Sequence, residues 1–245
     1  MKLAAKLHTT RAASREKGRS LCNVLRRFSF HFLFLVKESI HMVENMKKQV
    51  FSVRGLVEIG MLSALAFVLM LFSFPLPFAP SFYKLDFSEL PVVIGAFAIH
   101  PFAGVMIELI KMLLNLLIDG SATAGVGEIA NFFIGCCFIL PASVIYHRKK
   151  SKRNAIFGLC MGTILMTVVG CFLNAYVLLP AYSVAFHMEI EKLIAMGAAV
   201  NPSIGNLFTF VLLAVAPFNL LKGALVSIIT ILIYKRISII LKGKA

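Results

Sequence analysis

Hydrophobic residues form long, nearly unbroken blocks along most of this chain, and polar residues collect between them. The blocks cover approximately residues 56–74, 90–99, 102–118, 129–146, 155–179 and 207–234. A helix that crosses a bilayer needs roughly 20 apolar residues. The pattern therefore predicts an all-α integral membrane bundle with no room for a separate soluble domain.

Prolines mark the limits of several blocks. Pro75 and Pro80 follow the first block, Pro101 separates the second from the third, and Pro180 ends the fifth. Proline removes a backbone donor and interrupts a helix. We therefore expect a long loop at 181–206 before the last helix.

The block at 90–99 is ambiguous because ten helical residues rise only about 15 Å, half of a bilayer. The basic segments favour a separate span. With that span, the basic N-terminal segment, the run at 148–153 and the C-terminal tail share one side, as the positive-inside tendency requires. The sequence thus predicts six transmembrane helices with both termini cytoplasmic, and outer loops at 75–89, 119–127 and 181–206.

Composition and charge support a membrane protein rather than a nucleic-acid-binding one. Hydrophobic residues make up 59% of the chain and charged residues 15%, with a mean hydropathy of +0.88, whereas soluble domains are about 45–50% apolar. The net charge of +14 arises largely from residues that flank apolar blocks, which is a topology signal. No P-loop and no common hydrolase or metalloprotease motif occurs, and the cysteines and histidines suggest no disulfide or metal site.

Residues 1–45 differ from the rest, since they are basic and contain only one short apolar stretch, at 28–36. Two interpretations stay open. Met42 and Met46 precede the first block, so the gene start assigned at Met1 could be too early. Alternatively, the segment is a basic amphipathic extension on the inner leaflet. The membrane domain is taken as 46–245.

Polar residues inside apolar blocks are costly and are retained where they face a cavity or one another. Glu108, Lys111 and Asn115 share a helix face; the first two are expected to form an ion pair and Asn115 to face a ligand. Asn219 and Lys222 share a face of the last helix. Glu108 is the only carboxylate predicted at their depth, so one of the two lysines should point at a polar ligand.

Other candidate residues lie near the predicted outer surface. Glu128 and Asn131 open the fourth helix, and Asn174 lies in the outer third of the fifth. The first outer loop is aromatic and proline-rich, so it can fold over a pocket as a lid. In the first helix Gly60 and Ala64 are four apart, a spacing that lets another helix approach closely, either within the bundle or in a partner.

Six segments taken together resemble the S components of energy-coupling factor transporters, and within them the riboflavin-specific members. They are KLDFSELP at 84–91, AGVMIELIK at 103–111, GVGEIANF at 125–132, LPASVIY at 140–146, NAYVLLP at 174–180 and PFNLLKG at 217–223. The resemblance implies a six-helix subunit of a bacterial cell membrane that binds vitamin near the outer face without catalysis or a cofactor. It would dock, through small residues such as Gly60 and Ala64, on a transmembrane coupling subunit driven by two ATPases.

The chemical groups of riboflavin can be matched to the candidate residues. Its ring has two carbonyls flanking an N–H on one edge and is apolar elsewhere. Asn174, Asn219 and Lys222 could serve the edge; the other assignments are Tyr83, Leu85 and Phe87 to the ring faces, and Asp86, Glu128 and Asn131 to the ribityl hydroxyls.

Three alternatives stay open. They are another vitamin such as thiamine, an intramembrane enzyme using Glu108 and Lys111 as acid and base, and a facilitator without partners.

Overall fold

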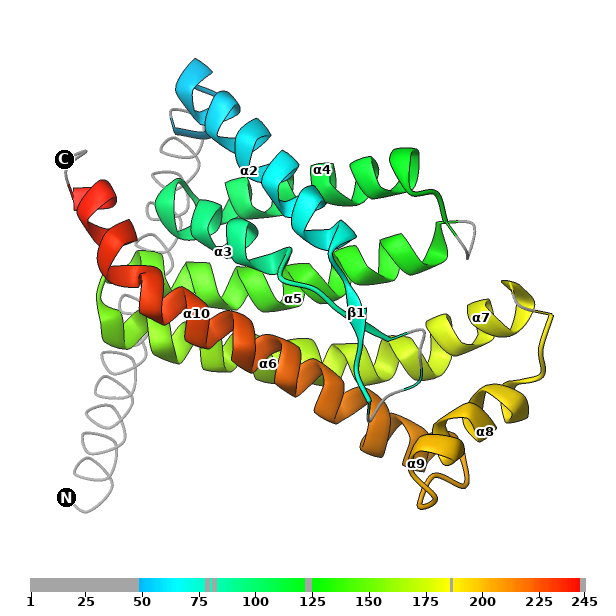
Figure 1. Ribbon diagram of the computed structural model, residues 1–245. Coiled ribbons are helices and arrows are strands. Elements are labelled where there is room, and N and C mark those ends of the chain that lie inside the picture. The colour runs from blue at the N-terminus through cyan, green and yellow to red at the C-terminus, as the bar shows by residue number, and fades with distance from the viewer. Residues whose placement is uncertain (1–48, 78–79, 81–82, 122–124, 186, 243–245) are drawn as a thin grey trace, which may run out of the picture. The chain divides into compact units, whose positions relative to one another are not determined.

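The described chain is almost entirely helical (Figure 1). The computed structural model describes residues 49–77, 80, 83–121, 125–185 and 187–242, and side chains only as far as residue 233. The predicted extension at 1–45 lies outside the described residues. Residues 49–245 group as one compact unit, and the description that follows concerns this unit alone.

Helices follow the predicted blocks closely, and two very short strands form an antiparallel ribbon between the first two helices. The strands are β1 (Phe74–Pro75) and β2 (Lys84–Leu85). The helices are α2 (Val53–Leu71), α3 (Glu89–Ala98), α4 (Pro101–Ile118), α5 (Val126–Arg148), α6 (Lys152–Leu173), α7 (Leu179–Ala185), α8 (Ile190–Val200), α9 (Leu207–Phe210) and α10 (Ala216–Lys242), with π-helical turns η1 (Asn174–Leu178) and η2 (Val211–Val215).

Five helical segments of the described chain are long and apolar enough to cross a membrane. They are Val53–Leu71, Pro101–Ile118, Val126–Arg148, Lys152–Ala185 and Leu207–Ile233. The predicted all-α membrane bundle is therefore confirmed. Helix α3 has only ten residues, so by length it does not count as a sixth span.

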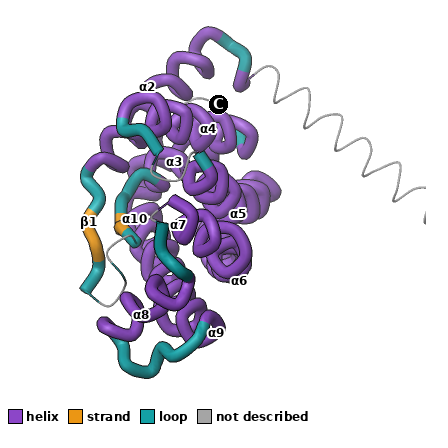
Figure 2. The backbone as a smooth tube through the Cα atoms, turned by 90° about the vertical axis from the view of Figure 1, so that its right-hand side faces the viewer, coloured by secondary structure: helices purple, strands orange, loops and turns teal. Residues whose placement is uncertain are grey.

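Helix α3 lies at the centre of the unit, where it contacts α2, α4, α5 and α10 (Figure 2). Helices α5 and α6 pack most closely of all, because glycines remove the side chains between them. A Cβ atom at Gly162 would lie 2.3 Å from the backbone oxygen of Phe138, and one at Gly158 would lie 2.6 Å from that of Ala142. This close packing makes α4, α5 and α6 a rigid side of any cavity that α3 and the loop before it enclose.

Two expectations about the region after α6 are wrong. The helix does not end at Pro180, because the wide turn η1 precedes it: the Leu179 N–H donates to the Asn174 oxygen five residues back. Such turns let a helix continue past a residue that cannot donate. The predicted loop at 181–206 also contains helix α8, whose Leu193 and Gly197 are buried. At Gly197 the ring of Phe210 leaves no room for a Cβ atom.

Candidate ligand-binding pocket

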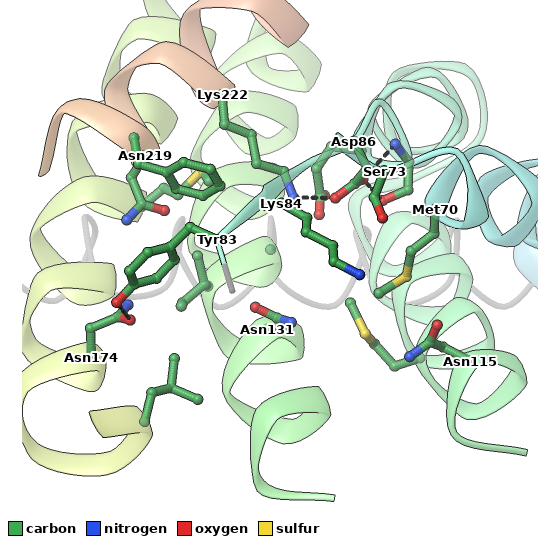
Figure 3. A pocket seen from close by; sticks show the side chains of 18 of the residues that line it. Met70, Ser73, Tyr83, Lys84, Asp86, Asn115, Asn131, Asn174, Asn219 and Lys222 are labelled. Atoms are coloured by element: carbon green, nitrogen blue, oxygen red, sulfur yellow. Dashed lines mark hydrogen bonds and ion pairs between the residues drawn. The ribbon is translucent and has the colours of Figure 1, made fainter. Parts of the chain in front are cut away.

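A pocket of about 230 Å³ opens where the loop before α3 meets the ends of several helices (Figure 3). Its lining combines amides, carboxylates, lysines, aromatic rings and thioethers. The lining residues are Met70, Ser73, Tyr83, Lys84, Asp86, Ser88, Glu89, Met112, Asn115, Asp119, Asn131, Ile134, Gly135, Met166, Asn174, Leu178, Tyr182, Phe218, Asn219 and Lys222. A concave site with a few convergent polar groups on an apolar background is typical of a small-molecule site.

Asp86 fixes the loop to helix α10. Its Oδ2 accepts from the Lys222 ammonium at 2.9 Å, and its Oδ1 accepts from the Ser88 backbone N–H at 2.8 Å and from the Ser88 hydroxyl. Burial alone would raise the pKa of Asp86, but the attraction of Lys222 and Lys111 outweighs it and lowers the pKa to about 2. Asp86 is therefore an anion at neutral pH, paired with a cation from the far end of the chain.

Lys111 is fully buried, and its ammonium group contacts three side chains. Its Nζ lies 3.0 Å from Glu89 Oε1 and 2.7 Å from Glu108 Oε2, and it donates to the Ser88 hydroxyl at 3.2 Å. The predicted Glu108–Lys111 ion pair is thus confirmed. Together with the Asp86 pair, these contacts make a continuous charged cluster of Asp86, Glu89, Glu108, Lys111 and Lys222.

The prediction that Glu108 is the only carboxylate at the depth of the two lysines is wrong. Asp86 pairs with Lys222 and Glu89 pairs with Lys111. Both carboxylates precede or open the apolar block of α3, and the sequence pattern had assigned them to an outer loop. The local signal was an acidic residue directly before an apolar block, where it also suits the helix N-terminus.

An amide wall faces the charged cluster, formed by Asn174, Asn219 and Tyr83. The Tyr83 hydroxyl donates to Asn174 Oδ1 at 2.6 Å. The side-chain NH₂ groups of Asn174 and Asn219 donate to the backbone oxygens of Gly170 and Val215, at 2.7 and 3.0 Å. No donor among the described residues contacts Asn219 Oδ1, so this wall keeps an acceptor free.

Aromatic packing holds Tyr83 in place. Its ring centre lies 5.4 Å from that of Phe218 and 6.3 Å from that of Phe210. Figure 3 shows Tyr83 between Asn174 and Asn219, and Lys84 extending into the pocket. The segment that leads into β2 thus places the Tyr83 ring on one side of the backbone and the flexible Lys84 side chain on the other.

The structure brings most of the sequence-predicted residues together. Seven of them line the pocket: Tyr83, Asp86, Asn115, Asn131, Asn174, Asn219 and Lys222. Three do not. Leu85 is buried in a hydrophobic cluster, the Phe87 ring lies 6.5 Å from that of Phe74, and Glu128 accepts from the Ser121 hydroxyl at 2.7 Å.

Sequence reasoning missed several lining residues, among them Lys84, Ser88, Glu89 and Phe218. Gly60 and Ala64 lie elsewhere, exposed on α2. Apart from the adjoining backbone of α2 itself, no atom of the described residues would come within 4 Å of a Cβ at Gly60. Glu108 and Lys111 are fully buried and do not line the pocket, so this pair is not placed to act on a substrate bound there.

Comparison with known proteins gives consistent results. A family model described as "ECF transporter, substrate-specific component" matches residues 54–234. The riboflavin transporter RibU of Staphylococcus aureus (strain TCH60) is 40% identical over 190 residues, covering 77% of this chain and 93% of that protein. The riboflavin transporter FmnP of Bacillus subtilis (strain 168) is 36% identical over 185 residues, covering 74% and 90%.

A solved structure is also similar. It is described as "Structure and mechanism of the S component of a bacterial ECF transporter", and it matches with a TM-score of 0.60 and 39% sequence identity. The match covers 76% of this chain and 96% of that one. The likeness therefore extends over nearly the whole of the solved chain.

Proposed function

This chain belongs to the substrate-specific components of energy-coupling factor (ECF) transporters, and on that premise we propose that it binds riboflavin for uptake by a bacterial cell. The relatives named above are riboflavin transporters, and none of those names denotes an enzyme. The observation that carries the proposal is the pocket itself, which joins a free amide acceptor, a lysine and aromatic rings in one cavity.

The amide wall suits one edge of the flavin ring. Asn219 Oδ1 has no donor among the described residues, so it can accept from the ring N–H that lies between the two carbonyls. The ring of Phe218, beside Tyr83, offers an apolar face for the flavin plane. An amide acceptor that stays unpaired in a dry site favours a ligand that supplies a donor.

Lys222 can serve the ligand without leaving Asp86. An ammonium group has three donors, and the contact with Asp86 uses one of them. A remaining N–H can reach a flavin carbonyl, while Asp86 keeps the side chain oriented. The pair therefore acts as an oriented donor rather than as a free positive charge.

A direct test is titration of riboflavin into the purified full-length protein, followed by quenching of flavin fluorescence. We expect saturable binding of one riboflavin per chain and no displacement by excess thiamine. Absence of quenching, or displacement by thiamine at equal concentration, would assign the pocket to another ligand.

We propose that the protein lies in the plasma membrane with six membrane elements, of which α3 is the short one. Both termini would then lie on the cytoplasmic side. The basic run at 148–153 supports this orientation. In a cysteine-free variant, an impermeant thiol reagent applied to intact cells should label His187→Cys and spare Ser151→Cys. The reverse labelling would invert the topology.

Transport requires other subunits, and we propose a transmembrane coupling subunit and two ATPases, with ATP hydrolysed only by the latter. Gly60 and Ala64 present an exposed, small-residue strip on α2, which allows a partner helix to approach closely. Gly60→Leu should reduce riboflavin uptake and leave binding unchanged. The control is Ala224→Leu, an equally bulky change at an exposed position of α10; loss of uptake in both variants would remove the special role of α2.

A further inference from the structure

The end of α3 that lies away from the pocket is held by two successive residues of α5. The Nε2 atom of His147 lies 2.9 Å from the backbone oxygen of Ala96. Because a carbonyl oxygen can only accept a hydrogen bond, Nε2 carries a proton and donates it. The ring of Tyr146 stacks on that of Phe97, with ring centres 4.5 Å apart and 19° between the ring planes. We call these four residues the α3 clamp.

The hydrogen bond in the α3 clamp has a physical cause. The last four carbonyls of a helix have no partner within it, and Ala96 is the third residue from the end of α3. Ala96, Phe97 and Tyr146 are at most 2% exposed. A carbonyl buried among such residues needs a donor from the protein, and His147 supplies it. His147 itself does not line the pocket.

Directional contacts hold α3 at both ends, but the two contacts differ in stiffness. At the pocket, where Ser88 and Glu89 are lining residues, Glu89 meets Lys111 at 3.0 Å. Lysine has a long flexible stem, so its ammonium group can follow a small shift of α3. The imidazole of His147 has only two rotatable bonds and cannot. Since Glu89 and Ala96 are only about 10 Å apart along the helix, a shift at one end displaces the other.

We propose that His147 is a positioning residue for the pocket. Its hydrogen bond to Ala96 fixes α3 along the helix axis, and this sets where Ser88 and Glu89 lie in the pocket lining. The affinity for the ligand therefore depends on a residue that does not line the pocket. The inference rests on the proposed function in one respect, because riboflavin is the ligand with which that affinity is measured.

The test separates the hydrogen bond from the space that the side chain fills. His147→Met removes the donor at similar volume, whereas in His147→Gln the side-chain NH₂ group can take the place of Nε2. Riboflavin is titrated into each full-length variant by fluorescence quenching, after size-exclusion chromatography and thermal unfolding have confirmed folding. We expect about tenfold weaker binding in His147→Met and an affinity within about twofold of wild type in His147→Gln.

A second measurement needs no ligand. Hydrogen exchange of the ligand-free protein, followed by mass spectrometry on peptides that cover residues 84–94, reports how firmly the pocket end of α3 is held. Exchange there should be faster in His147→Met, because α3 has lost the stiffer of its two directional contacts. It should stay at the wild-type rate in His147→Gln.

The chain offers a matched control in Ser143→Ala, one turn before His147 on the same helix. The Ser143 hydroxyl donates to the backbone oxygen of Ile139 at 2.7 Å. This variant therefore also loses a buried hydrogen bond of α5, but one that lies within α5 and does not reach α3. It should keep the wild-type affinity and exchange rate. Equal weakening of binding in Ser143→Ala and His147→Met would assign the effect to α5 stability and overturn the proposal.

His147→Asn keeps the proposal testable if His147→Met does not fold. Its amide is one methylene shorter than that of Gln and cannot reach Ala96, so the same loss of affinity is expected. Wild-type affinity and exchange in the folded variants without the donor, or equal losses in His147→Gln and His147→Asn, would overturn the proposal. If the wild-type protein does not bind riboflavin, the proposed function fails instead, and the exchange measurement still decides the role of His147.

Discussion

The charged cluster and the amide wall border the same pocket, but they differ in whether their polar groups are paired within the protein. In the charged cluster, the ammonium groups of Lys111 and Lys222 both meet carboxylates of the protein. In the amide wall, Asn219 uses its NH₂ group on its own helix and leaves Oδ1 without a donor. We propose that the difference reflects two tasks: the ion pairs hold the loop to the helices and orient Lys222, and the free acceptor of Asn219 is left for a ligand.

The strongest test of this division is Lys111→Met. The change removes the cation between Glu89 and Glu108, and an unpaired buried charge costs about 3–5 kcal/mol. We expect a loss of that order in the free energy of unfolding, measured by denaturant titration in detergent. Lys84→Met is the control, because Lys84 is exposed and has no partner among the described residues. Equal stability of the two variants would contradict a structural role for the cluster.

The Asp86–Lys222 pair should make stability depend on pH in the acid range. The folded-state pKa of Asp86 is about 2 and its ordinary value is 3.8. A lowered pKa stabilises the fold above the ordinary value, and this contribution disappears as pH falls toward about 2. The loss is about 2 kcal/mol. Thermal unfolding from pH 5 downward should show it in the wild type but not in Asp86→Asn, and identical profiles would mean that the pair contributes nothing.

A smaller effect, confined to ligand binding, is expected from Asn219→Ala. Without this acceptor the flavin N–H stays unpaired in the pocket, which should weaken riboflavin binding about tenfold. Leu221→Ala is the comparison, because Leu221 is on the same helix and does not line the pocket. Fluorescence quenching measures both. Wild-type affinity in Asn219→Ala would show that the amide bonds only to its own helix, and it would contradict the proposed difference between the charged cluster and the amide wall.

Deletion of residues 1–45 should have the smallest effect. The family match begins at residue 54 and the described pocket uses no residue before Met70. We therefore expect riboflavin affinity within twofold of the full-length value, roughly 0.4 kcal/mol, by the same titration. A truncated protein that folds in detergent but no longer binds would give this segment a place in the pocket's formation.

The sequence predicts the helices and many pocket residues because the signals are local. Bilayer-length apolar blocks locate the spans, and the spacing of Asn219 and Lys222 places them on one helix face. The sequence does not predict how deeply the residues of a loop are buried. Glu89 lies at the end of a loop in the pattern, yet it is buried beside Lys111. The direction in which a loop folds is decided by long-range packing, which periodicity does not record.

The amphipathic helix α8 was missed for a related reason. Its segment lies between prolines and carries charges, so it resembles a loop, but Leu193 and Gly197 bury one side of it. The glycine is needed because Phe210 lies where a side chain would project. Only the partner ring, which is distant in sequence, explains this residue.

The π-helical turn η2 also sets the angular phase of the last helix. In a regular α-helix, residues advance by about 100°, so two residues eight apart differ by about 80°. A π turn absorbs one additional residue, which reduces the difference between Phe210 and Phe218 to about 20°. Both rings can therefore meet the single ring of Tyr83, and one added residue in a turn aligns the whole of α10 with the pocket.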